Sequence, residues 1–204
     1  MRVMTVIGAR PQFIKAAPVC AAMKAGECEQ VLVHTGQHYD YGLSQVFFEE
    51  LGIPDPDINL GAGSGKHGAQ TARMLVGLEE AIEDCKPDFV LLYGDTNSTV
   101  AGALAAAKLH VPVAHVEAGL RSFNRRMPEE INRIVADAVA DLLFVPTKQA
   151  VVNLANEGVP AEKVHLVGDV MYDAALMHGE RADEKSRILS TVGVERGGYV
   201  LATV

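Results

Sequence analysis

Short apolar runs alternate with helix-like segments along most of the chain. The first run, residues 3–7, is followed at once by a turn at Gly8 and by a helical pattern that extends to about Ala25. Later runs at residues 89–93 and 111–116 are also followed by helical patterns. Strands that alternate with helices pair in parallel through right-handed crossovers. The sequence therefore predicts an α/β fold, a Rossmann-like parallel sheet with helices on both faces.

The pattern changes near residue 170. Residues 1–170 hold the alternation expected of one Rossmann-like domain, and a new helical pattern then covers about residues 172–189. The last apolar run, residues 199–204, predicts a strand that nothing in the chain covers. Domains rarely end on an open apolar strand. We therefore expect residues 171–204 to be a hinge helix and the first strand of an incomplete carboxy-terminal domain.

Composition excludes several classes of protein. The net charge of −8 opposes non-specific nucleic-acid binding, which needs a basic face. No apolar run approaches the roughly 18 residues of a membrane span. Three cysteines, at positions 20, 28 and 85, lack a C-x-x-C spacing, which is typical of reduced thiols in a cytoplasmic protein.

The glycine-rich segment 61–67 does not fit a known phosphate loop. Leu60 stands where the Walker motif needs glycine, and His67 stands where it needs Ser or Thr. The first strand–helix turn, residues 8–11, has one glycine and cannot be a dinucleotide fingerprint. The histidines show no zinc-ligand spacing. We therefore expect neither a metal nor a bound redox cofactor.

Polar residues cluster where the predicted strands end, which is where open α/β sheets bind ligands. Three carboxylates on one rim could divide acid and base roles between them, and cations near the first helix suit a phosphate. Each assignment has an alternative, because Arg10 could pair with a carboxylate, Asp95 could cap a helix and Glu129 could favour a helix dipole. The candidates at or near strand ends are Arg10, Lys15, Gln37, His38, Asp95, Glu117 and Glu129.

Five segments extend these observations to a known family. They are residues 8–15 (GARPQFIK), 34–40 (HTGQHYD), 93–99 (YGDTNST), 115–121 (HVEAGLR) and 128–133 (PEEINR). In this order they resemble the signatures of the non-hydrolysing UDP-N-acetylglucosamine 2-epimerases, and the resemblance continues to Val204.

The resemblance implies a fold, a reaction and a set of residues. The fold would be the first domain of the glycosyltransferase-B arrangement, in which two Rossmann-like domains face a cleft. The reaction would invert carbon 2 of UDP-N-acetylglucosamine by elimination and re-addition of UDP, without a cofactor, in cell-surface polysaccharide biosynthesis. The family also implies a homodimer and a second, regulatory UDP-sugar. By the same analogy Asp95, Glu117 and Glu129 are catalytic, whereas Arg10, Lys15, Gln37, His38 and Arg133 bind substrate.

Two departures leave the exact activity open. The family's His-Arg signature and most uridine contacts follow the position of Val204, so we expect these 204 residues alone to be inactive. The sequences GARPQ and Ser122-Phe123-Asn124 resemble the branch that includes 2,3-diacetamido-glucuronate epimerases. A non-catalytic sugar-nucleotide-binding module and a glycosyltransferase of the same architecture are the alternatives from other classes.

Overall fold

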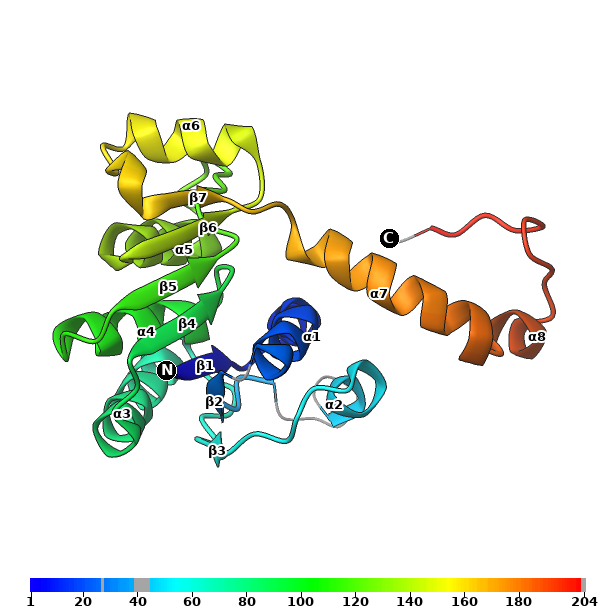
Figure 1. The fold of residues 1–204 in the computed structure, drawn as a ribbon, viewed down its shortest axis with the longest axis horizontal. Coiled ribbons are helices and arrows are strands. Elements are labelled where there is room, and N and C mark those ends of the chain that lie inside the picture. Colours follow the sequence, from blue (N-terminus) through cyan, green and yellow to red (C-terminus); the bar gives the residue numbers. More distant parts are fainter. Residues whose placement is uncertain (27, 39–44, 203–204) are drawn as a thin grey trace.

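A seven-stranded parallel sheet forms the centre of the computed structural model, which describes residues 1–26, 28–38 and 45–202 (Figure 1). The strand order is β3-β2-β1-β4-β5-β6-β7. This arrangement confirms the predicted Rossmann-like α/β fold. The strands are β1 (Arg2–Ile7), β2 (Glu29–His34), β3 (Ile58–Asn59), β4 (Phe89–Tyr93), β5 (Val113–Val116), β6 (Leu142–Val145) and β7 (Val164–Leu166).

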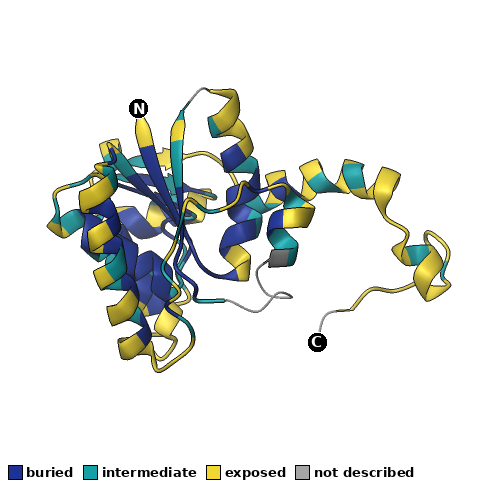
Figure 2. Ribbon diagram, turned by 90° about the horizontal axis from the view of Figure 1, so that it is seen from below, coloured by how far each residue is buried: buried dark blue, intermediate teal, exposed yellow. Residues whose placement is uncertain are grey.

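Helices cover the sheet on two faces, each with its own apolar core. The helices are α1 (Arg10–Ala25), α2 (Gln45–Leu51), α3 (His67–Cys85), α4 (Asn97–Lys108), α5 (Pro128–Val139), α6 (Lys148–Asn156), the short 3-10 helix Ala161–Lys163, α7 (Val170–Lys185) and α8 (Ile188–Val192). On one face α3, α4, α5 and α6 pack on the sheet, and on the other α1 and α2 do (Figure 1). Figure 2 shows the buried residues concentrated in the strands and in the helix faces turned toward them.

The side chains of each strand point alternately to the two faces of the sheet, and this alternation explains the two cores. In β4, Val90 and Leu92 join the core under α3 to α6, whereas Leu91 and Tyr93 join the core under α1. Successive side chains of a strand point to opposite faces, so a strand covered on both sides reads as an unbroken apolar run. The apolar run at residues 89–93 therefore marks a central, fully covered strand.

The strand order reverses between β1 and β4. From β1 the chain moves outward to β2 and β3, and from β4 it moves the other way through β5 to β7. A crevice opens at such a switch point, beyond the carboxyl ends of the strands. The turn into α1, the turn after β4 and the turn after β5 all lie at this end of the sheet, which brings the predicted site residues toward one place.

Local sequence fixes how the helices at this edge begin. Thr96 is the N-cap of α4, because its side chain accepts from the Thr99 amide and the Thr99 hydroxyl accepts from the Thr96 amide. Capping by Thr96 rules out the alternative of Asp95 as the helix cap. Pro128 begins α5, where a missing amide hydrogen costs nothing. The Gln12 side chain accepts from the amides of Gly8 and Ala9 and so closes the turn into α1.

The carboxy-terminal residues differ from the sequence prediction. The helix expected over residues 172–189 forms as two helices, α7 and α8, which separate at Ser186 and Arg187. Residues 199–202 do not form the expected strand, and residues 203–204 lie outside the described residues. A strand needs a neighbour to satisfy its backbone groups, and no described strand lies beside this segment. The division into domains at residue 170 stays a prediction.

Two further features complete the fold. An apolar hollow of about 460 Å³ lies over the sheet between α1 and the start of α7, and Leu91, Val116 and Phe144 are among its lining side chains. Helix α7 packs against α1 and extends away from the sheet (Figure 1). No helix in the part of the chain that the structure describes is long and apolar enough to cross a membrane.

Two glycine-to-alanine substitutions test the packing of the helices on the sheet. A Cβ added at Gly102, in buried α4, would lie 2.6 Å from Leu92 Cδ2. We expect Gly102→Ala to lower the free energy of unfolding by about 1–3 kcal/mol through overpacking. Gly179, in α7, has no atom within 4 Å of such a Cβ. Gly179→Ala should raise the free energy of unfolding by about 0.5–1 kcal/mol, because alanine is the better helix former. Urea unfolding of both variants measures the difference, and equal stabilities would refute it.

Candidate active site

A lysine and a glutamate meet at the switch point. Lys15 projects from the second turn of α1, is buried, and forms an ion pair with Glu117, the first residue after β5. Gly94, directly after β4, makes room for this pair, because a Cβ there would lie 2.9 Å from Lys15 Nζ and 3.1 Å from Glu117 Oε2. Its φ of +61° also favours glycine. The Glu117 carboxylate therefore lies against the residue that precedes Asp95.

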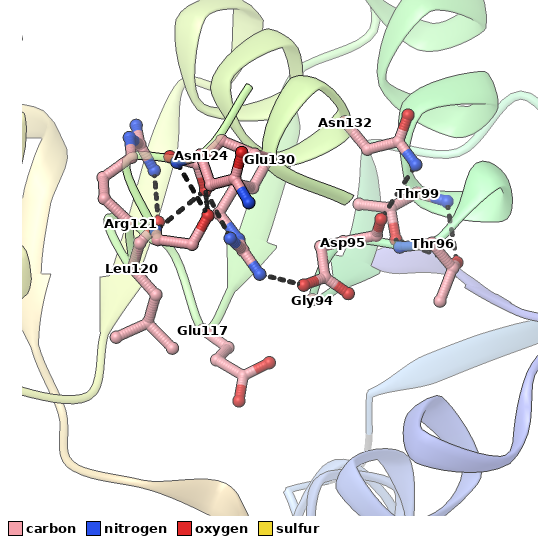
Figure 3. A network of polar contacts seen from close by, with 12 residues as sticks. Gly94, Asp95, Thr96, Thr99, Glu117, Leu120, Arg121, Asn124, Glu130 and Asn132 are labelled. Atoms are coloured by element: carbon pink, nitrogen blue, oxygen red, sulfur yellow. Dashed lines mark hydrogen bonds and ion pairs between the residues drawn. The ribbon is translucent and has the colours of Figure 1, made fainter. Parts of the chain in front are cut away.

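Asp95 has its own cationic partner. Arg133 of α5 forms an ion pair with Asp95 through one guanidinium nitrogen and with Glu130 through another. Figure 3 shows Asp95 after β4 and Glu130 at the start of α5. The Asp95 backbone is also fixed, because Asn132 Nδ2 donates to the Asp95 carbonyl over 2.9 Å. The Asp95 side chain keeps 30 % of its surface exposed, so the carboxylate is oriented but still open to a ligand.

Glu130 links the loop before α5 to the ion pair of Arg133 and Asp95. Its side chain is almost fully buried and accepts hydrogen bonds from the Ser122 amide, the Ser122 hydroxyl and the Phe123 amide, in addition to Arg133. Burial would raise the pKa of this carboxyl group, but the four donors outweigh burial and lower the pKa to about 2. Glu130 is therefore ionised whenever the protein is folded at ordinary pH.

A buried ionic network lies beneath the turn after β4. His115 of β5 is fully buried, with Nδ1 2.7 Å from Asp137 Oδ1 and Nε2 2.7 Å from the Gly94 carbonyl oxygen. Asp137 also accepts from Arg121, and Arg121 forms a second ion pair with Glu157. Burial would raise the pKa of Asp137, but the bonds from His115 and Arg121 hold it below the usual value. The acidic and basic side chains of this network thus compensate one another.

The α1 side of the site is held by neutral contacts. Gln37 Oε1 accepts from the Ser98 amide and the Ser98 hydroxyl at the start of α4. His38 Nδ1 accepts from the Arg10 amide over 3.0 Å. The Arg10 side chain is exposed and forms no ion pair within residues 1–26, 28–38 and 45–202. The alternative of Arg10 paired with a carboxylate therefore has no support in the described part of the chain.

Two residues at the rim have left-handed backbone conformations that disfavour ordinary side chains. Glu117 has φ +68° and Phe123 has φ +57°. Such conformations cost of order 1 kcal/mol each and concentrate at functional sites. The Phe123 side chain is 77 % exposed, so packing does not explain its conformation. The hydrogen bond from the Phe123 amide to Glu130 explains the conformation, because this bond fixes the loop backbone.

The predicted residues divide into those that the contacts bring together and those that they do not. Lys15 pairs with Glu117 beside Gly94, and Arg133 of α5 pairs with Asp95, the residue that follows Gly94. Glu129 is exposed in the first turn of α5, and none of the ion pairs among the described residues includes it. The catalytic and substrate-binding roles assigned to all eight residues stay predictions. No cluster of three or more potential metal ligands occurs among the residues that the structure describes.

Several residues of the site, Glu130, Arg121 and Glu157 among them, escaped the sequence analysis, and three of these residues lie closest to the turn after β4 or hold its backbone. These are His115 and Asp137 of the buried network, and Asn132, which fixes the Asp95 backbone. A usable signal was the spacing in α5, where Glu130, Arg133 and Asp137 are three and four residues apart and therefore share a helix face. His115 offered no signal, because a histidine inside an apolar strand reads as a core residue.

A Rossmann-like sheet with carboxylates and cations paired at its switch point defines an α/β protein with a cluster of charged side chains at the strand ends. The comparisons with known proteins specify which one. The family model of UDP-N-acetylglucosamine 2-epimerase matches residues 21–204. The chain belongs to this family.

Similar proteins agree in sequence and in structure. A Methanococcus maripaludis UDP-N-acetylglucosamine 2-epimerase homolog is 51 % identical over 100 % of the chain and 57 % of its own length. The Pseudomonas aeruginosa UDP-2,3-diacetamido-2,3-dideoxy-D-glucuronate 2-epimerase is 54 % identical with the same coverage. The crystal structure of Methanocaldococcus jannaschii UDP-GlcNAc 2-epimerase in complex with UDP-GlcNAc and UDP superposes with a TM-score of 0.92, at 43 % identity, over 94 % of this chain and 53 % of that one. The chain thus spans about half the length of the curated relatives it matches.

Substitution of Glu130 tests the network in the loop before α5. We expect Glu130→Gln to lower the free energy of unfolding at about pH 7 by roughly 1–3 kcal/mol, because the amide cannot accept all the bonds and leaves Arg133 less compensated. The folded-state pKa of about 2 lies below the ordinary 4.5, so Glu130 stabilises the protein above pH 4.5 and loses this effect as pH falls toward 2. The difference between wild type and variant should shrink over that range.

Glu129→Gln is the matched control for this experiment, since it makes the same chemical change one residue earlier in α5. Glu129 can contribute only a helix-dipole effect of about 1 kcal/mol or less. Denaturant unfolding at several pH values measures both variants. A Glu130→Gln effect that is as small as the control, or that does not vary with pH, would contradict the assigned network.

Proposed function

We propose that the full-length protein inverts carbon 2 of a UDP-2-acetamido sugar, with UDP-N-acetylglucosamine converted to UDP-N-acetylmannosamine, and that this chain supplies the acidic rim of the active site. The observation that carries the proposal is the pair of carboxylates after β4 and β5, Asp95 and Glu117, each held by its own cation beside Gly94. The family membership agrees with it. Because the chain spans about half of its relatives, the reaction is proposed for the whole protein.

The chemistry requires groups that handle a proton on either face of the sugar. The C2 proton is not next to a carbonyl group, so its direct removal is difficult. If the C1–O bond to UDP breaks as the proton leaves C2, a C1=C2 double bond forms and UDP departs with the bonding electrons. Return of a proton to the opposite face of C2 and return of UDP to C1 complete the inversion. Two oriented carboxylates could act as base and acid, and they would also stabilise positive charge on the ring.

The cations have a separate role in this proposal. Lys15 and Arg133 orient the carboxylates, whereas Arg10 at the beginning of α1 has no acidic partner among the described residues and is available to the departing diphosphate. Glu129 would be a third acidic group at the start of α5, and Gln37 and His38 would contact substrate from the α1 side.

A second substrate has a specific observation in its favour. The relative at 54 % identity is named as a UDP-2,3-diacetamido-2,3-dideoxy-D-glucuronate 2-epimerase. The same inversion at C2 would serve this sugar, which differs at C3 and C6. Side-by-side kcat/KM values with the two UDP-sugars decide between the substrates.

We also propose a cytoplasmic homodimer that serves cell-surface polysaccharide biosynthesis, with a second UDP-sugar as a regulator near Gln37. The three cysteines are free, as a reducing compartment requires. Light scattering of the full-length protein would test the dimer, and a sigmoidal dependence of rate on substrate that is lost in Gln37→Ala would test the regulator.

Exchange in heavy water tests the reaction itself. We expect the full-length protein to place deuterium at C2 of UDP-N-acetylglucosamine or of the diacetamido-glucuronate sugar, because the proton taken from C2 mixes with solvent before it returns. Mass spectrometry and proton NMR of the recovered sugar measure the incorporation. A protein that binds UDP-sugars by calorimetry and never exchanges C2 would be the binding module, and the proposed reaction would be wrong.

Asp95→Asn tests the role of the carboxylate after β4. We expect kcat for C2 exchange to fall by about 10²–10⁴-fold, the range typical of a lost acid or base, while the protein stays folded because Arg133 keeps Glu130 as a partner. Asp84→Asn is the control, since Asp84 is exposed near the end of α3. This position lies just before β4 begins, whereas Asp95 follows the end of β4. Near-normal exchange by Asp95→Asn would remove Asp95 from the mechanism.

A further inference from the structure

His115 lies directly under the turn that carries Asp95, and no role was predicted for it. Its imidazole is fully buried and has an oxygen 2.7 Å from each ring nitrogen, the Gly94 carbonyl at Nε2 and Asp137 at Nδ1. A buried histidine at the centre of a parallel sheet is costly unless both nitrogens are satisfied. Both are satisfied here, by partners on two different elements.

The partners determine the protons on the ring. A carbonyl oxygen can only accept, so Nε2 carries a proton and donates to Gly94. Asp137 also accepts from the Gly119 amide and from Arg121, and the pKa of its carboxyl group is lowered, so it is an ionised acceptor as well. Nδ1 lies against this carboxylate, so the ring joins Asp137 of α5 to the turn after β4.

The bond to Gly94 matters because glycine restrains its own peptide so weakly. Gly94 has φ +61° and no Cβ, so hydrogen bonds must set the direction of the peptide that joins it to Asp95. The Gly94 amide donates to the Val116 carbonyl, and the Gly94 carbonyl accepts from His115. Without the His115 bond, the Gly94 carbonyl would be a buried acceptor without its partner, and the peptide could rotate and displace Asp95.

We propose that His115 is a positioning residue, a buried imidazole that links Asp137 of α5 to the Gly94 carbonyl and so fixes the Asp95 carboxylate for the reaction at C2. This inference rests on the proposed function. His115 does not touch the sugar. It acts through the Gly94–Asp95 peptide, while Asn132 and Arg133 hold the Asp95 carbonyl and carboxylate from the same helix.

Two isosteric variants of the full-length protein separate this role from simple core stability. The side-chain nitrogen of glutamine reaches about as far as Nε2 and can still donate to Gly94, whereas the amide of asparagine reaches only as far as Nδ1 and Asp137. We expect His115→Asn to lower kcat for C2 exchange by about 10–100-fold with KM nearly unchanged, the loss expected of a misplaced catalytic group. His115→Gln should retain most of the wild-type kcat, although thermal unfolding should show both variants destabilised.

The opposite results would overturn the proposal. If His115→Asn is as active as His115→Gln, or if the two lose activity in proportion to their stability, the histidine is only a core residue. A rise in KM at constant kcat would also contradict a role in positioning Asp95.

A spectroscopic arm keeps the proposal testable if both variants fail to fold. In wild-type full-length protein labelled with nitrogen-15 histidine, Nε2 of His115 should give the signal of a protonated nitrogen that donates a hydrogen bond. A deprotonated Nε2 would overturn the bond to the Gly94 carbonyl and with it the proposed link. This measurement does not depend on turnover, so a wild type that never exchanges C2 would refute the proposed function alone.

Discussion

One helix face organises the charged end of this fold. Glu130, Arg133 and Asp137 project from α5 three and four residues apart, and each binds a different part of the strand-end loops. Glu130 holds the loop before the helix, Arg133 holds Asp95, and Asp137 holds His115 and Arg121. Because Pro128 fixes where α5 begins, the amino-acid sequence determines which side chains of the helix face the strand-end loops.

Charge compensation makes this arrangement possible at low exposure. Lys15 pairs with Glu117, Arg133 with Asp95 and Glu130, and Arg121 with Asp137 and Glu157. An uncompensated charge at such depth would cost several kcal/mol, so removal of one member is more harmful than the absence of the whole pair. The pairs therefore specify geometry more than they add stability, and geometry is what a proton transfer to a sugar carbon requires.

The sequence predicted the sheet and its helices well because the relevant signals are local. Apolar runs such as residues 89–93 mark strands covered on both faces, and Thr96 and Pro128 mark helix starts. The strand expected at residues 199–204 is not formed over the described residues 199–202, because strand formation depends on a neighbouring strand that a local pattern cannot supply.

The site was predictable only in part. Strand-end position and motif resemblance identified Asp95, Glu117, Lys15 and Arg133, which the structure joins through ion pairs. The link from Asp137 through His115 to Gly94 joins residues 22 and 21 positions apart in the chain. It depends on the pairing of β4 with β5 and on the packing of α5, and neither can be deduced from the spacing of residues alone.

The absence of a side chain at Gly94 has a consequence for other proteins of this architecture. Any Cβ at that position would crowd the ammonium and the carboxylate that meet there, so the two could not keep the same contact. A homologous chain with a larger residue at this turn would hold its lysine and glutamate in a different contact. The identity of a single backbone position thus limits how closely an ammonium and a carboxylate can approach at the end of the sheet.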